Sequence, residues 1–244
     1  MSKPDQMTFL EHLEELRWRV IKSMVAIVAV AIAAFIKADL VIAFLTAPID
    51  KLEDPVALQA LKVSDMFMVQ LLASLIVGLV LASPIVIHQI WRFIQPALGR
   101  SSRRTTISVV LFGSFFLLMG VSFGYLILLP FSLRFFTKLG GDIVAANYSI
   151  HAYLGYVAWM LIAAGLVFQL PVVSFILTRI GLLTPTFLRR YRRYALVGIL
   201  VFAAVLTPPD PLSQIFMAVP LLLLYELSIL ISKIFQKTEQ VEDA

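Results

Sequence analysis

The chain contains 244 residues, of which 60% are hydrophobic and 14% charged, and its mean hydropathy is +0.93. This composition excludes an ordinary soluble domain and indicates a polytopic α-helical membrane protein. The absence of cysteine excludes disulfides and thiolate metal sites. In such a protein a net charge of +5 reflects basic residues that set the membrane topology, so we expect no nucleic-acid partner.

A charged stretch, residues 7–22, precedes the first long apolar run. It carries three carboxylates and three cations, namely Glu11, Glu14, Glu15, Arg17, Arg19 and Lys22. Helical spacing places the carboxylates on one face and puts Glu15 four residues before Arg19. The stretch is therefore either an amphipathic lead-in helix (residues 1–19) tied to the membrane surface by ion pairs, or an acidic cluster that receives a basic ligand.

Six apolar segments are predicted to cross the membrane, because a ~30 Å hydrocarbon core needs about 20 apolar residues in a helix. They cover residues 20–36, 66–90, 107–129, 152–177, 194–206 and 212–231. Pro48 is expected to end a short apolar piece in the first loop, Pro84 to kink the second span, and Pro130 to close the third. A polar loop is predicted over residues 91–106. We thus predict a single all-α domain over residues 1–244, with a tail at 233–244.

The distribution of basic residues predicts the orientation. With the N-terminus inside, the outer loops hold five of the 20 basic residues, which are Lys37, Lys51, Lys62, Arg134 and Lys138. The other fifteen are inside, as the positive-inside rule requires. Both termini are therefore expected in the cytoplasm.

The last two helices are predicted to be short. Residues 194–206 make a helix of ~20 Å, and Glu226 interrupts the final apolar run. Such spans either thin the bilayer locally or have ends capped by snorkelling side chains. Glu226 is expected to pair with a cation of the basic loop at residues 189–193.

Gln169 is predicted near the middle of the bilayer, ~15 Å from the basic boundary at Arg179. A polar side chain at that depth needs a hydrogen-bond partner. Gln169 therefore either bonds to a neighbouring helix or faces a wet groove.

Enzyme chemistry is not expected. The sequence contains no H-E-x-x-H, G-x-S-x-G, P-loop or G-x-G-x-x-G motif. The predicted topology separates His151 from His12 and His88, so the histidines cannot share a metal. We predict no catalytic residue, no metal and no cofactor.

Four motifs occur along the chain: H-L-E-E-L-R at 12–17, P-A-L-x-x-x-x-R-R at 96–104, F-Q-L-P at 168–171 and L-T-P-P-D-x-x-S-Q at 206–214. Together they resemble the TatC family, the large integral subunit of the twin-arginine protein translocase, over residues 8–233. The resemblance implies a cupped, multi-pass protein of a bacterial or archaeal cytoplasmic membrane. It also implies proton-motive-force-driven export of folded proteins whose signal peptides carry an arginine pair.

The resemblance assigns the signal-peptide site to the first cytoplasmic segments. It makes Glu15 the carboxylate for the peptide's arginines, which suits a guanidinium because the two groups pair in a bidentate fork. The remaining candidates are Glu14, Glu11, Arg17, Ser102 and Arg103. Ser102 stands where the family usually has a second acidic residue, so we expect the peptide's apolar segment to supply most of the affinity.

The resemblance also implies small single-span partner subunits of the TatA and TatB type. Polar positions for these partners or for the concave face are Gln169, Thr207 and Gln214. Structural motif positions are Pro48, Phe93, Pro208, Pro209, Asp210 and Glu226. Membrane lipid and self-association are further expected partners. The alternative, a small-solute or ion-coupled secondary transporter, predicts internal repeats that the sequence does not show.

Overall fold

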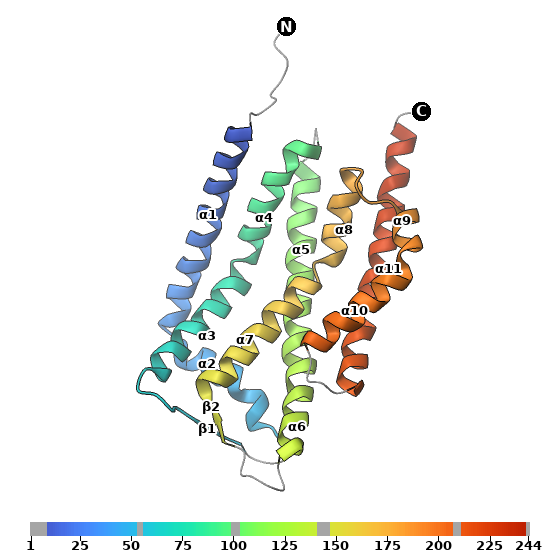
Figure 1. Cartoon of the computed structure of the whole chain (residues 1–244). Coiled ribbons are helices and arrows are strands. Elements are labelled where there is room, and N and C mark those ends of the chain that lie inside the picture. The colour runs from blue at the N-terminus through green and yellow to red at the C-terminus, as the bar shows by residue number, and fades with distance from the viewer. Residues whose placement is uncertain (1–8, 53–55, 99–102, 141–146, 207–210, 243–244) are drawn as a thin grey trace.

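Long helices stand side by side in the computed structural model, which describes residues 9–52, 56–98, 103–140, 147–206 and 211–242 (Figure 1). The helices are α1 (Phe9–Phe35), α2 (Ala38–Asp50), α3 (Asp65–Leu81), α4 (Ser83–Ile94), α5 (Arg103–Phe123), α6 (Leu129–Gly140), α7 (Ile150–Val167), α8 (Leu170–Arg179), α9 (Pro185–Arg190), α10 (Arg192–Leu206) and α11 (Pro211–Glu242). Figure 1 shows the start of α1 and the end of α11 at one end of the bundle, here called the terminal end. The opposite end carries two strands and is called the strand end.

The predominantly helical prediction is confirmed, but it missed one pair of short strands. β1 (Ala57–Gln59) and β2 (Asn147–Ser149) pair in parallel, with Ala57 opposite Asn147. Three-residue strands are too short to show the alternating pattern by which strands are found in a sequence. The pair joins two connections far apart in the sequence, and β2 leads directly into α7.

Several helices are long enough to cross a membrane. In the described part of the chain four qualify by length and composition, namely Leu10–Phe35, Arg103–Lys138, Ile150–Arg179 and Gln214–Gln236. Helices α3 and α4 add a fifth if this pair, bent by 55°, is one crossing. The chain is thus a multi-pass membrane protein. α10 has 15 residues, a length of ~22 Å, so it is short as predicted. The sixth crossing and the orientation stay predictions.

The predicted kink at Pro84 is confirmed. α3 ends at Leu81, and Pro84 lies in the first turn of α4, where the missing N–H costs no helical hydrogen bond. Pro171 has the equivalent place in α8, after the break at Phe168 and Gln169. Both predicted spans therefore consist of two helices each.

Several helices extend into charged sequence that was expected to be loop or tail. The predicted loop over residues 91–106 is too long, because α4 ends at Ile94 and α5 begins at Arg103. A bond of 3.0 Å from Trp91 Nε1 to Thr106 Oγ1 joins these two helices. The short final helix is also wrong, because α11 has 32 residues and continues through Glu226. Apolar composition indicates only the part of a helix that faces lipid. Backbone hydrogen bonds can continue the helix beyond that part. Likewise α1 includes the lead-in stretch and the first span in one helix.

Pro130 does not close the third span as predicted. α5 passes through a π-helical segment, Gly124–Leu128, and continues as α6. The N–H of Leu129 donates to the carbonyl of Gly124, five residues earlier. This wider turn lies directly before the residue that has no N–H, so the helix accommodates Pro130 without ending.

Pro48 also lies inside a helix, contrary to the predicted bend. A proline has no N–H to donate to the carbonyl four residues earlier, which here belongs to Phe44. The hydroxyl of Tyr125 donates to that carbonyl instead, and the ring of Tyr125 stacks on Phe44 at 4.5 Å. The next carbonyl, of Leu45, accepts a 2.8 Å bond from the hydroxyl of Tyr153. Two tyrosines from α7 and the π segment thus hold α2 in place.

The core lies around α7, whose residues Leu154, Val157 and Ala164 are fully buried. Close helix approach depends on glycine at two crossings. A Cβ on Gly120 would lie 2.6 Å from the carbonyl oxygen of Ala164, and one on Gly78 would lie 2.7 Å from that of Ile27. Small residues permit such contacts between membrane helices, where packing replaces the hydrophobic effect.

A double-mutant cycle tests the role of the Tyr125 hydroxyl. Tyr125→Phe should lower the free energy of unfolding by about 1 kcal/mol, because the Phe44 carbonyl loses its donor. In a Pro48→Ala background the same change should cost clearly less, since the new N–H can donate to that carbonyl. Denaturant titration in detergent measures both costs, with Tyr148→Phe as a tyrosine control in β2. Equal costs in the two backgrounds would contradict this role.

Candidate functional site

Glu15 and Arg19 form an ion pair one helical turn apart near the terminal end of α1. Arg19 Nε donates to Glu15 Oε1 at 2.9 Å, and Arg19 Nη2 also donates to Oε1. Both side chains are largely shielded, with 18% of Glu15 and 16% of Arg19 exposed. The predicted pairing of these two residues is confirmed, and Arg19 therefore holds one carboxylate oxygen of Glu15.

The second carboxylate oxygen of Glu15 is in a different situation. Oε2 is buried and has no hydrogen-bond partner in the structure. The Nδ1 atom of His12 lies 3.6 Å from this oxygen, within ion-pair range but too far for a good hydrogen bond. Buried carboxylate oxygens are normally satisfied. Glu15 thus presents a shielded acceptor that a further donor could bind.

One aromatic contact and one hydrogen bond fix the surroundings of Glu15. The ring of His12 stacks on Phe93 of α4, with centroids 4.3 Å apart and planes 13° apart. α4 is itself tied to α5, because buried Trp91 donates to Thr106. His12, which lies beside the Glu15 carboxylate, is consequently positioned by a neighbouring helix as well as by its own. Phe93, expected to be structural, supports the candidate site.

The other predicted signal-peptide residues are either exposed or outside the described part of the chain. Glu11, Glu14 and Arg17 lie on the same helix with exposed side chains. Arg103 is the first residue of α5 and is also exposed. Ser102 lies outside the described residues. The structure therefore brings Glu15 together with Arg19, His12 and Phe93. The spacing of three residues between His12 and Glu15 could have indicated that these two side chains are neighbours. The sequence carries no signal for the contact between His12 and Phe93.

Of the two possibilities predicted for Gln169, the structure shows the hydrogen bond to a neighbouring helix. Its Nε2 donates to the backbone carbonyl of Gly113 on α5 at 3.0 Å. The side chain stands at the break between α7 and α8 and is half-buried. Gln169 thus links α8 to α5. Because Gly113 has no side chain, its backbone carbonyl is open to the amide of Gln169.

The start of α11 carries the remaining polar candidates. Gln214 Nε2 donates to the carbonyl of Leu200 at 3.0 Å, which joins α11 to α10. Further along α11, Glu226 Oε2 accepts from Arg192 Nη2 at 2.6 Å, so its predicted pairing with the basic loop is confirmed. The candidates Thr207, Pro208, Pro209 and Asp210 lie outside the described residues.

Comparisons with known proteins agree on one family. The family described as Sec-independent protein translocase protein (TatC) matches residues 11–220. The protein of that name from Desulforapulum autotrophicum is 36% identical over 245 residues, covering 100% of this chain and 91% of the relative. TatCy of Bacillus subtilis is 38% identical over 243 residues, covering 99% and 95%.

A solved structure agrees with these relatives. The crystal structure of the twin arginine translocase receptor TatC superimposes with a TM-score of 0.76 at 37% identity, covering 92% of this chain and 99% of that one.

Two substitutions test whether Gln169 acts as a hydrogen-bond donor. Gln169→Leu should lower the unfolding free energy by about 0.5–1.5 kcal/mol through loss of the bond to Gly113. Gln169→Glu should be more harmful at pH 8, because a carboxylate cannot donate to a carbonyl, and should recover at pH 5 as the protonated form becomes available. Thermal unfolding in detergent at both pH values measures this difference. A pH-independent effect of Gln169→Glu would overturn the donor assignment.

Proposed function

This chain belongs to the TatC family of translocase components, and we propose that it is the signal-peptide receptor and core subunit of a twin-arginine protein translocase. It is a non-enzymatic transport protein. The observation that carries the receptor role is the Glu15 carboxylate, which is shielded, held in place, and bonded on one oxygen only. Proton-motive force as the energy source follows from the family resemblance.

Arginine suits this carboxylate better than lysine does. A guanidinium carries five donors in a rigid plane and can approach Glu15 Oε2 while Arg19 keeps Oε1. An ammonium is more strongly hydrated and acts as a point charge, so entering a shielded site costs it more. The site thus favours arginine over lysine in a signal peptide. A pair of consecutive arginines could bind Oε2 with one residue and the exposed carboxylates of Glu11 and Glu14 with the other.

Arg19 acts as a resident competitor for the incoming arginine. It already satisfies Glu15 Oε1, and an ion pair one turn apart on a helix contributes only ~0.3–1 kcal/mol. An external guanidinium can displace so weak a pair or share the carboxylate with it. Selectivity therefore comes from Glu15, whereas most affinity comes from the apolar segment of the signal peptide.

Partner subunits of the TatA and TatB type are proposed to bind where α10 ends and α11 begins. α10 is too short to span the bilayer alone, and Gln214 ties it to α11. Large apolar side chains remain exposed on both helices, such as Val205, Val201 and Phe216. A single apolar helix could cover these side chains. The bond from Gln214 fixes the relative position of the two helices that would receive it.

Signal-peptide binding tests the receptor role. Glu15→Gln should remove the preference for an Arg-Arg over a Lys-Lys signal peptide, because the neutral amide no longer attracts a guanidinium. Arg19→Gln should strengthen binding of the Arg-Arg peptide about twofold to fivefold by removing the competitor. Fluorescence anisotropy with labelled peptides and the full chain in nanodiscs gives both results. Glu226→Gln, which alters a carboxylate paired elsewhere, serves as the control. A preference that survives Glu15→Gln would refute the site.

Membrane orientation can be tested with single cysteines, since the parent chain contains none. Val63 near the strand end is fully exposed, and Leu182 between α8 and α9 is 72% exposed. If the terminal end is cytoplasmic, an impermeant maleimide should label Val63→Cys in intact cells and Leu182→Cys after permeabilisation alone. Labelling of Leu182→Cys in intact cells would reverse the proposed orientation.

A further inference from the structure

Four arginines and three aromatic residues are gathered where α9 meets α10. Residues 187–194 read F-L-R-R-Y-R-R-Y, and residues 180–206 contain no aspartate or glutamate. Seven of these eight side chains are exposed, and together they are called the α9–α10 patch: Phe187, Arg189, Arg190, Tyr191, Arg192, Arg193 and Tyr194. The patch is thus basic and aromatic at once.

Contacts with α11 hold the patch in place. Leu188, the buried residue within it, accepts a 2.7 Å bond at its backbone carbonyl from the hydroxyl of Tyr225. Arg192 joins the start of α10 to α11 through its ion pair with Glu226. Figure 1 shows α9 beside α11 at one edge of the bundle. The exposed side chains therefore extend from a backbone whose position α11 fixes.

Most of the positive charge of the patch is not balanced by a carboxylate. Arg192 has its partner on α11, but in the described part of the chain no ion pair joins a carboxylate to Arg189, Arg190 or Arg193. The guanidinium of Arg193 lies over the ring of Tyr194 instead, 5.0 Å from its centroid. Positive charges gathered in this way repel one another, and an anion that approaches them relieves the repulsion.

The aromatic rings connect the patch to an apolar helix. The ring centroids of Phe187 and Tyr191 are 4.5 Å apart, and those of Tyr191 and Tyr194 are 5.8 Å apart, so the three rings form one row. The rest of α10, residues 195–206, is apolar. Basic and aromatic side chains beside an apolar segment are typical of the membrane–water interface. The patch therefore fits the level of the lipid headgroups.

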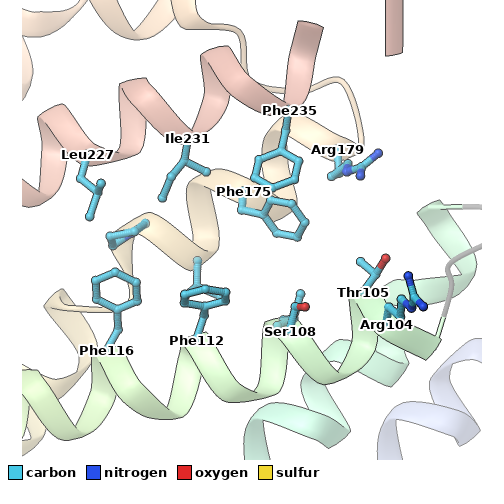
Figure 2. Close-up of a pocket in the computed structure, with 13 residues that line it drawn as sticks. Arg104, Thr105, Ser108, Phe112, Phe116, Phe175, Arg179, Leu227, Ile231 and Phe235 are labelled. Carbon is cyan, nitrogen blue, oxygen red and sulfur yellow. The ribbon is translucent and has the colours of Figure 1, made fainter. Parts of the chain in front are cut away.

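The patch is distinct from the apolar groove of about 510 Å³ between α5, α8 and α11 (Figure 2). No residue of the patch lines this groove. Figure 2 shows Arg179 at one end of the groove, and its guanidinium lies 5.4 Å from the ring of Phe235 and 5.8 Å from that of Phe175. Arg179 is thus engaged by contacts within the protein, whereas Arg189 and Arg190 are exposed on the surface.

We propose that the α9–α10 patch binds the headgroups of anionic phospholipids. Guanidinium groups bind phosphate oxygens through paired, charge-assisted hydrogen bonds, which assigns the phosphates to Arg189, Arg190 and Arg193. The row of exposed rings favours a lipid over an acidic peptide, because a membrane surface offers apolar chains directly beside its phosphates. Glu15 lies on α1, outside the patch, so this proposal and the proposed receptor role can each fail without the other.

Site-specific quenching tests the proposal in proteoliposomes of the full chain. Because the chain has no cysteine, Thr186→Cys can carry a single bimane fluorophore one helical turn before Arg189 and Arg190. Leu111→Cys can carry one on α5, where that residue is 64% exposed. Brominated phosphatidylglycerol and brominated phosphatidylcholine, each a minor component of both leaflets, serve as quenchers.

We expect phosphatidylglycerol to quench the Thr186 label at about fivefold lower mole fraction than phosphatidylcholine does, an effect that one basic residue near an anionic surface can produce. The Leu111 label should respond equally to both lipids. Since both leaflets contain both lipids, the result does not depend on the orientation of the chain. Equal quenching of the Thr186 label by the two lipids would disprove the proposal. A Thr186 label that neither lipid quenches would also disprove it, and would indicate a protein segment over the patch.

Charge removal gives the second arm of the test. Arg189→Gln with Arg190→Gln should reduce the difference between the two lipids at the Thr186 label to less than about twofold. Arg134→Gln with Lys138→Gln removes the same charge from exposed positions on α6 and should leave the difference intact. A difference that persists without Arg189 and Arg190 would contradict the assignment of the phosphates to them. If that variant does not fold, the two labels in the otherwise unaltered chain still decide whether the patch binds the anionic lipid.

Discussion

The structure depends on one constraint, which is that backbone polar groups inside a hydrocarbon layer must find partners within the protein. The prolines show how the fold meets it. The carbonyl that Pro48 leaves without a helical donor is bonded by Tyr125, and a π turn precedes Pro130. Pro84 and Pro171 need no compensation, because each begins a helix. At these four prolines the interruption therefore coincides with a helix start, a π turn or a specific side-chain donor.

The same constraint governs the polar side chains between helices. Gln169 and Gln214 each donate to a backbone carbonyl of a neighbouring helix, and Thr178 donates to Ser232 between α8 and α11. These bonds fix the relative positions of the helices that they join. Glu15 departs from this pattern, since one of its oxygens is shielded from water without receiving a hydrogen bond. A shielded acceptor left open is costly to the fold, and a ligand that supplies the donor recovers that cost.

Local spacing predicted the features that lie within one helix or at its ends. The pair of Glu15 and Arg19 follows from a separation of four residues, and the bend before Pro84 follows from its missing N–H. Contacts between helices could not be predicted in this way. The stacking of His12 on Phe93 depends on how α1 and α4 cross, and the partner of Gln169 is a backbone carbonyl that no side-chain pattern reveals. Helix lengths were underestimated because apolar composition records contact with lipid rather than helical hydrogen bonding.

The start of α1 brings charges of opposite sign together at the terminal end of the molecule. Carboxylates gather at the start of α1, at one edge of the bundle in Figure 1, whereas α11 lies at the opposite edge and packs against α8. Attraction between exposed charges falls off over about 8 Å at physiological salt, so the charges of α1 act mainly on groups near that edge. Charges of both signs thus stand close together on α1, and Glu15 Oε2 is the acceptor that Arg19 leaves open.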